Sequence, residues 1–513
     1  MTKPFSHQTR TENIHRLKSE SFDVLVIGGG ITGAGLALDA SMRGLKTALI
    51  EKGDFASGTS SKSSKLIHGG LRYIQTKQFK FVFEALRERS LLLKYAPQYV
   101  SPLAFIVPIY DDSPVGYVKM AAGLFLYDML SLGRLIHRHK NFFSKKIHEN
   151  EPELKQEGLQ GGFLYYDCLT NDAALTLSVA QTAHQHGACM ANYVQAISFN
   201  PHNSHHETSH SFDGRTITVR DEITQQSFEI KTRYVMNATG PWSDLTRKIL
   251  KPDIQKKLFP SRGIHIVFRK EALPTQHAVV LWTKDKRITF LIPWGDYQIF
   301  GTTESKFSGQ PEDVNASRNE VDYLIETAKH YFPTHPITYK DILSTYAGIR
   351  PLIKDDSDHE SSYHASREHE IIEDMPGFFS ILGGKLTTYR KMAQDAVDRI
   401  SKKPCRTKSI PLYHPQISSP PSMGGGKGEG DTVKNHLEWS IQNEMTQTVC
   451  DYLMRRTSIF LTSQDQGYEA SKVVASHMAQ FLNWDEKRIQ KELKDYQYQI
   501  DLSRKYLSES VRP

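Results

Sequence analysis

The sequence is poor in cysteine. Its 513 residues include four cysteines, which stand far apart and form no C-x-x-C pair: Cys168, Cys189, Cys405 and Cys450. This scatter excludes a disulfide framework and a zinc site built on paired cysteines. We therefore expect reduced thiols in a cytoplasmic protein.

Long apolar runs are also missing. The strongest candidate, residues 115–140 (VGYVKMAAGLFLYDMLSLGRLIHRHK), is interrupted by Lys119 and Asp128. It stays short of the roughly 18 uncharged residues of a transmembrane helix. The first 20 residues have no apolar core, which excludes a secretory signal. We predict that residues 1–20 form a mobile tail.

The sequence also has no excess of acidic residues. Lysine and arginine number 64 against 57 for aspartate and glutamate, so the formal net charge is +7. This balance suits anionic ligands or an anionic membrane surface. No nucleic-acid motif accompanies the charge, so we expect no nucleic-acid partner. The histidine-rich stretch 200–214 lacks a fixed ligand spacing, which predicts a solvated loop and no metal site.

Residues 23–52 (DVLVIGGGITGAGLALDASMRGLKTALIEK) have the pattern of a strand, a helix and a second strand. The apolar, partly β-branched runs 24–27 and 47–50 predict neighbouring buried strands of a parallel sheet. Three consecutive glycines end the first run, and an acid follows the second. This order is typical of a dinucleotide-binding unit.

Each residue of the glycine motif has its own task in such a unit. Gly28 permits a tight turn out of the strand, Gly30 lets the backbone approach a pyrophosphate, and Gly33 lets the helix pack on the sheet. The helix N-terminus then faces the phosphates with its N–H groups. Glu51 is placed to accept hydrogen bonds from a ribose.

Further elements follow along the chain. Apolar spacing predicts a helix over residues 79–95, and Asn171 with Asp172 could cap another that ends at Gly187. Strand-like segments after residue 260 predict a second, largely antiparallel sheet. Residues 401–431 are rich in proline, glycine and serine and read as a linker. Residues 432–513 have helical periodicity and are predicted to form a separate helical domain.

Six other stretches, taken together with the glycine motif, resemble the FAD-dependent glycerol-3-phosphate dehydrogenases of the D-amino-acid oxidase superfamily. The stretches are TSSKSSKLIHGGLRY (59–73), NATGPWSD (237–244), IPWGDYQIFGTTE (292–304), YAGIRPL (346–352), GGKLTTYRKMA (383–393) and YLMRRTSIFL (452–461).

The resemblance implies an α/β fold. It consists of a Rossmann-like FAD-binding domain with a doubly wound parallel sheet, a β-rich substrate domain and an α-helical C-terminal domain. Residues 21–400 would form the oxidoreductase region, with the substrate domain mainly at 80–165 and 255–350. The linker at 401–431 and the helical domain at 432–513 complete the chain.

The resemblance also implies FAD rather than NAD as cofactor. Besides Gly28, Gly30, Gly33 and Glu51, it assigns to the FAD site Thr59, Ser60, Ser61, Ser63, Ser64, Lys65, Leu66, Val194, Ala238, Gly240, Gly384, Lys385, Leu386 and Thr387. Of these, Val194 matches the position whose backbone meets the adenine. Lys385, at the start of a helix, would place positive potential beside the flavin.

The substrate implied by the resemblance is sn-glycerol 3-phosphate. Arg72 and Arg350 would bind its phosphate, because a guanidinium offers a planar fork to phosphate oxygens. Tyr73 could add a hydroxyl donor, and Lys385 is a further candidate. Catalytic roles fall on His68, Arg350 and Lys385.

His68 is the favoured general base, since an imidazole suits removal of a hydroxyl proton near neutral pH. Two alternatives stay open: His68 hydrogen-bonds or covalently links the flavin, or Lys385 or Arg350 lowers the hydroxyl pKa and water takes the proton.

The implied reaction gives dihydroxyacetone phosphate and passes electrons to a membrane quinone. The competing activities are an oxidase that makes hydrogen peroxide, an amine or amino-acid oxidase, and a silent flavoprotein scaffold. A quinone partner requires a protein bound to the inner face of the cell membrane; a homodimer is left open. Residues 115–140 could lie in an anionic membrane interface, or form a buried helix with a basic end. Arg455 and Arg456 mark the next candidate anchor.

Overall fold

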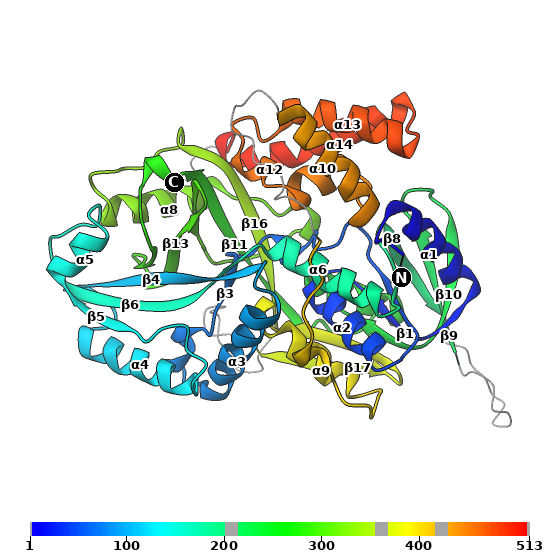
Figure 1. Ribbon diagram of the computed structural model, residues 1–513, viewed down its shortest axis with the longest axis horizontal. Helices are drawn as coiled ribbons and strands as arrows, with labels where there is room; N and C mark the ends of the chain where they lie inside the picture. The colour runs from blue at the N-terminus through cyan, green and yellow to red at the C-terminus, as the bar shows by residue number, and fades with distance from the viewer. Residues whose placement is uncertain (1–2, 201–213, 354–367, 416–428, 510–513) are drawn as a thin grey trace.

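The computed structural model describes residues 3–200, 214–353, 368–415 and 429–509. Two large sheets lie side by side, and a group of helices from the end of the chain packs across one side of them (Figure 1). The histidine-rich stretch falls outside the described residues apart from its two ends.

The first sheet is built on parallel strands. Its central order is β17-β18-β10-β1-β2-β7, with β9 paired to β10 and β8 paired to β9. The parallel members are β1 (Ser21–Ile27), β2 (Thr47–Ile50), β7 (Cys189–Ala191), β10 (Ser227–Asn237) and β18 (Phe378–Gly383). The antiparallel additions are β8 (Val194–Asn200), β9 (Arg215–Asp221) and β17 (His369–Met375). The predicted parallel pairing of the first two strands is confirmed.

Helices cover one face of this sheet and close the first core. They are α2 (Ile31–Met42), α6 (Asp172–Gln185) and α9 (Tyr389–Val397). Asn171 caps α6, as predicted, because its side chain accepts a hydrogen bond from the Ala174 N–H at 3.1 Å. The α7 helix (Ser243–Leu250) lies against β8 and β18.

The N-terminal segment is helical, so the prediction of a mobile tail over residues 1–20 is wrong. The α1 helix (His7–Ser19) starts at Ser6, whose side chain accepts a hydrogen bond from Thr9. Ile14 and Leu17 are buried in the core on the face of the sheet opposite α2. Buried polar contacts hold the same helix, since Arg10 pairs with Asp221 and Asn13 donates to the Met190 carbonyl oxygen.

The second sheet is mainly antiparallel, as the sequence predicted. Its order is β15-β11-β14-β13-β12-β4-β6-β3, with β16 paired to β11 and β5 to β6. The strands are β3 (Leu66–Ile67), β4 (Val100–Tyr110), β5 (Lys140–Phe143), β6 (Leu159–Thr170), β11 (Leu258–Arg269), β12 (Ala278–Trp282), β13 (Ile288–Trp294), β14 (Tyr297–Gly301), β15 (Ser305–Lys306) and β16 (Ile342–Ile353).

Helices lie on both faces of the second sheet. The α8 helix (Arg318–Tyr331) packs on one face, while α3 (Phe79–Tyr95) and α4 (Tyr117–Leu130) pack on the other. The short α5 helix (Ser144–Asn150) follows β5 (Figure 1). The helix predicted over residues 79–95 is confirmed by α3.

The C-terminal helices have a core of their own. They are α10 (Glu429–Asn443), α11 (Val449–Asp451), a π-helical turn (Tyr452–Arg456), α12 (Ile459–Thr462), α13 (Tyr468–Leu482) and α14 (Glu486–Arg504). Leu437, Tyr452, Val474 and Tyr496 are buried among them. Helices that could cross a bilayer, judged by length and apolar character, are absent from the described residues. The domain boundaries at 400 and 431 stay a prediction.

Candidate functional site

A cavity of about 1730 Å³ runs between the two sheets and reaches the C-terminal helices. Most residues predicted for the site line it: Gly28, Gly30, Glu51, Thr59, Ser60, Ser63, Ser64, Leu66, His68, Arg72, Tyr73, Val194, Ala238, Gly240, Arg350, Gly384, Lys385, Leu386 and Thr387. Gly33, Ser61 and Lys65 are the predicted residues that lie outside this lining. Segments far apart in the sequence therefore meet at one cavity.

The glycine motif forms a tight turn from β1 into α2. Gly28 has a φ of +112°, and a Cβ there would lie 2.6 Å from the Ala238 carbonyl oxygen. A Cβ on Gly33 would lie 1.8 Å from the Gly28 carbonyl oxygen, so only glycine permits this approach of helix and strand. Gly30 is the N-cap of α2, and Gly30, Ile31 and Thr32 line the cavity at the start of this helix.

Glu51 is held by the backbone on both of its oxygens. Oε2 accepts a hydrogen bond from Gly29 N at 2.6 Å, and Oε1 accepts one from Gly53 N at 2.8 Å. Burial raises the pKa of Glu51, while these two hydrogen bonds oppose the rise. Each oxygen keeps a further lone pair that a ribose hydroxyl could use.

The loop from Thr59 to Tyr73 forms a long stretch of the cavity wall. Ser60 Oγ accepts the Ile31 N–H at 2.9 Å, which ties the loop to the start of α2. Ser63 Oγ and Lys65 Nζ both donate to Asp172, at 2.7 Å each. The Lys65 side chain therefore points into an ion pair, and only its backbone is left to serve a cofactor.

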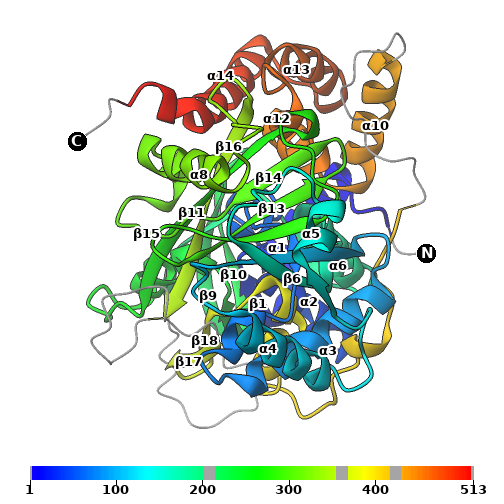
Figure 2. The ribbon, with the colours of Figure 1, turned by 90° about the vertical axis from the view of Figure 1, so that its left-hand side faces the viewer.

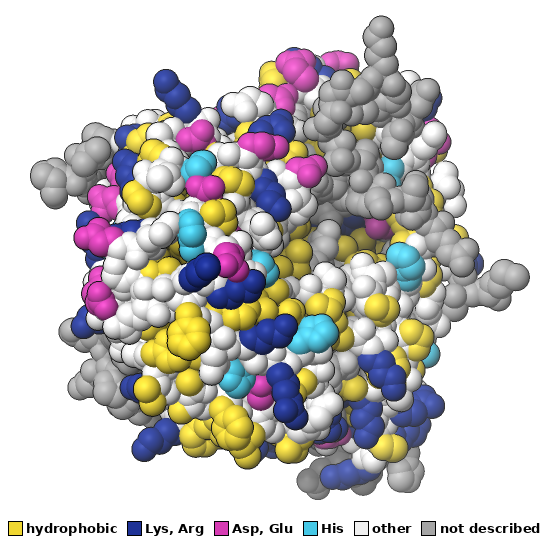
Figure 3. Space-filling view, turned by 60° about the vertical axis from the view of Figure 1, so that its left-hand side comes forward, with side chains coloured by type: hydrophobic (Ala, Val, Ile, Leu, Met, Phe, Trp, Pro, Cys, Tyr) yellow, Lys and Arg dark blue, Asp and Glu magenta, His cyan; other side chains and the backbone are white. Residues whose placement is uncertain are grey.

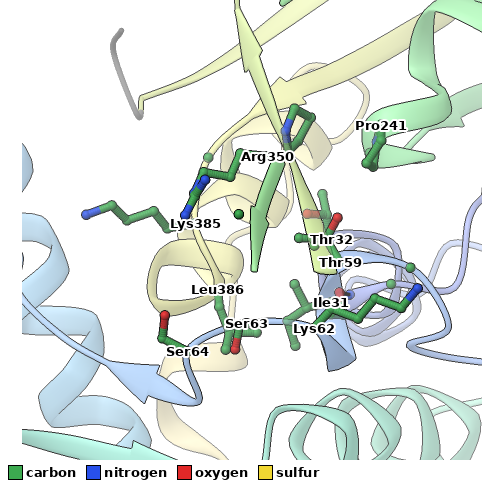
Figure 4. Close-up of a pocket in the computed structure, with 18 of the residues that line it drawn as sticks. Ile31, Thr32, Thr59, Lys62, Ser63, Ser64, Pro241, Arg350, Lys385 and Leu386 are labelled. Atoms are coloured by element: carbon green, nitrogen blue, oxygen red, sulfur yellow. Dashed lines mark hydrogen bonds between the residues drawn. The ribbon is translucent and has the colours of Figure 1, made fainter. Parts of the chain in front are cut away.

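The segment after β18 closes the same wall. Gly384 has a φ of +81°, and a short 3₁₀ turn (Leu386–Thr388) leads into α9. Thr387 Oγ1 lies 3.2 Å from the His68 backbone N, so this segment supports the loop that carries His68. Figure 4 draws Lys385 and Arg350 close to one another, with Ile31 and Lys62 further along the cavity.

Three cationic side chains, those of Lys385, Arg72 and Arg350, line the cavity. Lys385 Nζ lies 3.9 Å from the centre of the Tyr73 ring, and Arg72 Nη2 donates to the Tyr73 hydroxyl at 3.1 Å. Arg350 Nη2 donates to Thr302 Oγ1 at 2.7 Å. All three line the same cavity as His68, where their charge suits a small anion.

Several residues that shape the site were not identified from the sequence. Asp167 accepts hydrogen bonds from the Tyr127 hydroxyl at 2.8 Å and from Gly69 N at 3.2 Å, and it also pairs with Arg89. Asp172 had been interpreted only as a helix cap. Both carboxylates are buried and fix the loop that carries His68 and Arg72.

His265 is a second imidazole in the site that sequence reasoning missed. Its Nε2 lies 2.8 Å from Ser64 Oγ, and its ring stacks on Tyr346 with centres 4.7 Å apart. Burial, together with the charges of Arg350 and Lys65, holds the pKa of His265 well below its usual value. The sequence around His265 predicts only a strand. A histidine within an apolar run was the one feature that could have indicated a functional residue.

The residues present fit a flavin dinucleotide. The turn at Gly28 and Gly30 leaves room for a pyrophosphate, and Glu51 faces the place of a ribose. Polar side chains of the 59–73 loop continue the wall toward His68.

Comparison with known proteins identifies the family. The family model described as FAD dependent oxidoreductase matches residues 23–390, and that of the C-terminal domain of alpha-glycerophosphate oxidase matches residues 425–489. Aerobic glycerol-3-phosphate dehydrogenases of Staphylococcus aureus are 35% identical over 473 residues, which is 89% of this chain and 82% of theirs. The chain belongs to the FAD-dependent glycerol-3-phosphate dehydrogenases. FAD is therefore the cofactor, and the chain is an oxidoreductase by family.

Solved structures have the same fold. The glycerol-3-phosphate dehydrogenase from Bacillus halodurans, complexed with FAD, matches with a TM-score of 0.77 at 27% identity, over 99% of this chain and all of the other. L-alpha-glycerophosphate oxidase from Mycoplasma pneumoniae matches with a TM-score of 0.59 at 18% identity, over 78% of this chain and all of that one. The second likeness concerns the fold alone.

Proposed function

We propose that this protein oxidises sn-glycerol 3-phosphate to dihydroxyacetone phosphate and delivers the electrons through FAD to a membrane quinone. The observation that carries the proposal is the cavity itself: the dinucleotide turn and the cluster of Arg72, Arg350 and Lys385 line one continuous space. The family supports the same reaction, because its curated relatives are named for this substrate.

The cationic cluster would bind and orient the substrate. Arg350 and Arg72 would donate hydrogen bonds to the phosphate oxygens, and the Tyr73 hydroxyl lies beside Arg72 to add a donor. Lys385 would hold positive charge at the same wall. A phosphate held there brings C2 and its hydroxyl near His68, which lines the cavity between Leu66 and Arg72.

Oxidation at C2 removes a hydride and a hydroxyl proton. FAD, when bound, accepts the hydride. We assign the proton to His68, whose backbone is held by Thr387 on one side and whose neighbour Gly69 is held by Asp167. His265 is less suited, since its Nε2 already lies against the Ser64 hydroxyl.

A lipid-soluble acceptor is supported by the rest of the cavity. The cavity also reaches α4, β12 and β13, where its lining includes Val115, Met120, Gly123, Leu126, Val280 and Phe290, with Lys119 beside them. A small phosphate ester would make few contacts with these apolar side chains, whereas a quinone ring could pack against them. This mainly apolar lining therefore favours a quinone over water-soluble acceptors.

The outer face of α4 supports binding to the membrane. Met120, Leu124 and Tyr127 are buried, as the core interpretation of this segment required. Val118 and Phe125, however, are 82% and 61% exposed, and Met129 and Leu132 are exposed beside them. Figure 3 shows apolar side chains gathered with lysines and arginines on the part of the surface where Figure 2 places α4. We infer a peripheral position on the inner face of the cell membrane.

The test of the reaction is anaerobic reduction. Purified protein with FAD bound should lose its flavin absorbance on addition of sn-glycerol 3-phosphate, and an amino acid should have no effect. Absence of bleaching would contradict the proposed reaction.

The test of the acceptor follows reoxidation of the reduced protein. A quinone analogue should reoxidise the flavin faster than dissolved oxygen does. A stoichiometric yield of hydrogen peroxide would favour the oxidase instead.

A further inference from the structure

The two arginines of the π-helical turn, Arg455 and Arg456, do not face a membrane. Their side chains are 9% and 2% exposed, and both point to Asp54, which is fully buried. This result excludes them as the alternative membrane anchor. It also leaves the YLMRRTSIFL stretch without a role in the reaction described above.

Arg456 makes a bidentate ion pair with Asp54. Its Nη1 lies 2.8 Å from Asp54 Oδ2, and its Nη2 lies 3.0 Å from Asp54 Oδ1. Arg455 Nε donates to Asp54 Oδ2 at 2.6 Å. Burial alone would raise the pKa of Asp54, but Arg456 and Arg455 lower it below its usual value. The carboxylate thus stays ionised between two guanidinium groups.

Asp54 follows the ribose-facing Glu51 by three residues. Between them, Gly53 N donates to Glu51 Oε1, and Gly53 O accepts the Tyr193 N–H at 2.9 Å. The Glu51 carboxylate and Asp54 are therefore connected through the hydrogen bonds of Gly53.

Residues 192–194, at the adenosine end of the cavity, are bonded both to Glu51 and to the C-terminal helices. Val194 N donates to Glu51 O at 2.7 Å, and the preceding Tyr193 has a φ of +57°. The Tyr193 hydroxyl donates to Asp451 Oδ1, and Arg455 Nη2 donates to that same atom at 2.8 Å. Asn192 Nδ2 bridges Asp54 and the Met445 carbonyl oxygen.

The C-terminal helices also contribute to the cavity surface. Thr448, Cys450, Met454 and Arg455 line it together with Lys52 and Tyr193. The helical domain is thus in contact with the cofactor cavity at its adenosine end. Buried, hydrogen-bonded ion pairs hold this contact, and removing one partner from such a pair is costly because a charge is left without compensation.

The geometry points to a clamp on the cofactor. Arg455 and Arg456 are positioning residues that hold the segments 51–54 and 192–194 against one another, so that the C-terminal domain sets the affinity for the adenosine half of FAD. The flavin half, bound by the 59–73 loop and residues 384–387, does not depend on them.

The test measures release of FAD from the holoenzyme. Free FAD fluoresces, so dilution gives its dissociation constant, and displacement by ADP gives that of the adenosine half alone. Arg456→Met should raise both constants by the same factor, about tenfold or more. Arg456→Lys keeps the charge and loses the bidentate geometry, so its dissociation constants should lie between those of the parent protein and those of Arg456→Met.

The matched control is Arg390→Met. Arg390 forms a bidentate buried pair with Glu88, at 2.7 Å and 2.6 Å, between α9 and α3 and outside the cavity lining. It should lower the melting temperature of the protein as Arg456→Met does, yet leave both dissociation constants unchanged.

Three results would overturn the clamp: unchanged FAD affinity in Arg456→Met, weaker FAD with unchanged ADP affinity, or equal losses in Arg390→Met. If Arg456→Met does not fold, Tyr193→Phe decides, because it removes one hydroxyl from the network. It should raise both constants about threefold or more, and unchanged constants would refute the clamp.

Discussion

At the scale of single residues, Arg350 lies where the absence of a side chain at Gly263 leaves room for it. A Cβ on Gly263 would come within 2.4 Å of Arg350 Nη2. Thr302 and the Thr303 carbonyl oxygen then fix the guanidinium from one side. The fork is preorganised for a planar, bidentate contact.

Arg350→Ala and Arg72→Ala test the phosphate contact. Each should lose about tenfold to a hundredfold in kcat/KM for sn-glycerol 3-phosphate, because a charge-assisted contact is removed. Glycerol, which has no phosphate, serves as the control substrate and should show a smaller loss. Equal losses for the two substrates would contradict the assignment.

Substitution of the two imidazoles of the site should have different effects on the rate of flavin reduction. His68→Asn should keep FAD bound and slow anaerobic flavin reduction by about a hundredfold or more. His265→Gln should slow it by less than about tenfold, since His265 packs on Tyr346 and bonds Ser64. Stopped-flow absorbance measures both rates. The reverse order would move the general base to His265.

Lys62 gives the site a pH dependence. It lies two residues after Ser60, which bonds the first turn of α2, and it lines the cavity with Ile31. Burial, and then Arg455, lower the pKa of Lys62 to about 8, while Glu312 opposes them. A pyrophosphate bound nearby would favour the ammonium form and raise this pKa.

The sign of the FAD dependence follows from this change. FAD binds better when Lys62 is protonated, so its dissociation constant should rise about tenfold between about pH 7 and about pH 9. Flavin fluorescence at each pH measures the constant. Lys62→Met should bind FAD more weakly at low pH and show a flat profile. A parent-like slope in that variant would place the titrating group elsewhere.

At the scale of elements, two helical glycines differ in the space around them: one is in close contact with a neighbouring strand, and the other is not. A Cβ on Gly33 in α2 meets the Gly28 carbonyl oxygen at 1.8 Å, whereas one on Gly123 in α4 meets nothing within 4 Å. Gly33→Ala should lower the free energy of unfolding by about 3 kcal/mol and reduce FAD content. Gly123→Ala should raise that free energy by about 0.5 to 1 kcal/mol.

Denaturant unfolding with flavin quantification measures both glycine variants. If the two changed stability alike, the close approach of α2 to β1 would not be needed.

The elements that the sequence predicted best are those whose signal is local. The strands around the glycine motif, α3 and the capped α6 each follow from residues within a few positions of one another. The same holds for the glycine turn and for Glu51, whose spacing identifies them before any contact is known.

The parts that the sequence missed depend on contacts over long separations. Asp172 meets Ser63 across 109 positions, and Asp167 meets Gly69 across 98. Periodicity carries no information about such pairs. The α1 helix was missed for a related reason, because its few apolar residues are explained only by the sheet face that they cover.

At the scale of the whole molecule, an exposed basic segment directly follows the exposed apolar residues of α4 along the chain. Arg134, Arg138 and Lys140 are exposed there, close in sequence to Met129 and Leu132. This combination is typical of helices that bind in the plane of an anionic interface.

Flotation with vesicles tests the surface. Binding should need anionic lipid and weaken with salt. It should weaken further when Arg134, Arg138 and Lys140 are replaced by serine, by about 1 kcal/mol per basic residue. Activity with a soluble dye acceptor should persist in that variant. Flotation equal to that of the parent would exclude this surface as the anchor.

The ion pair between Asp54 and Arg456 joins residues 402 positions apart, which orders events during synthesis. A ribosome adds about 5 to 20 residues per second, so Asp54 waits about 20 to 80 s for its partner. The glycine turn exists from early in that interval, while the adenosine end is still open. We expect ribosome-stalled chains that end before residue 452 to exchange FAD quickly, and finished chains to exchange it slowly, as flavin fluorescence would measure. The π-helical turn, made long after Asp54, would then make a loosely held cofactor a tightly held one.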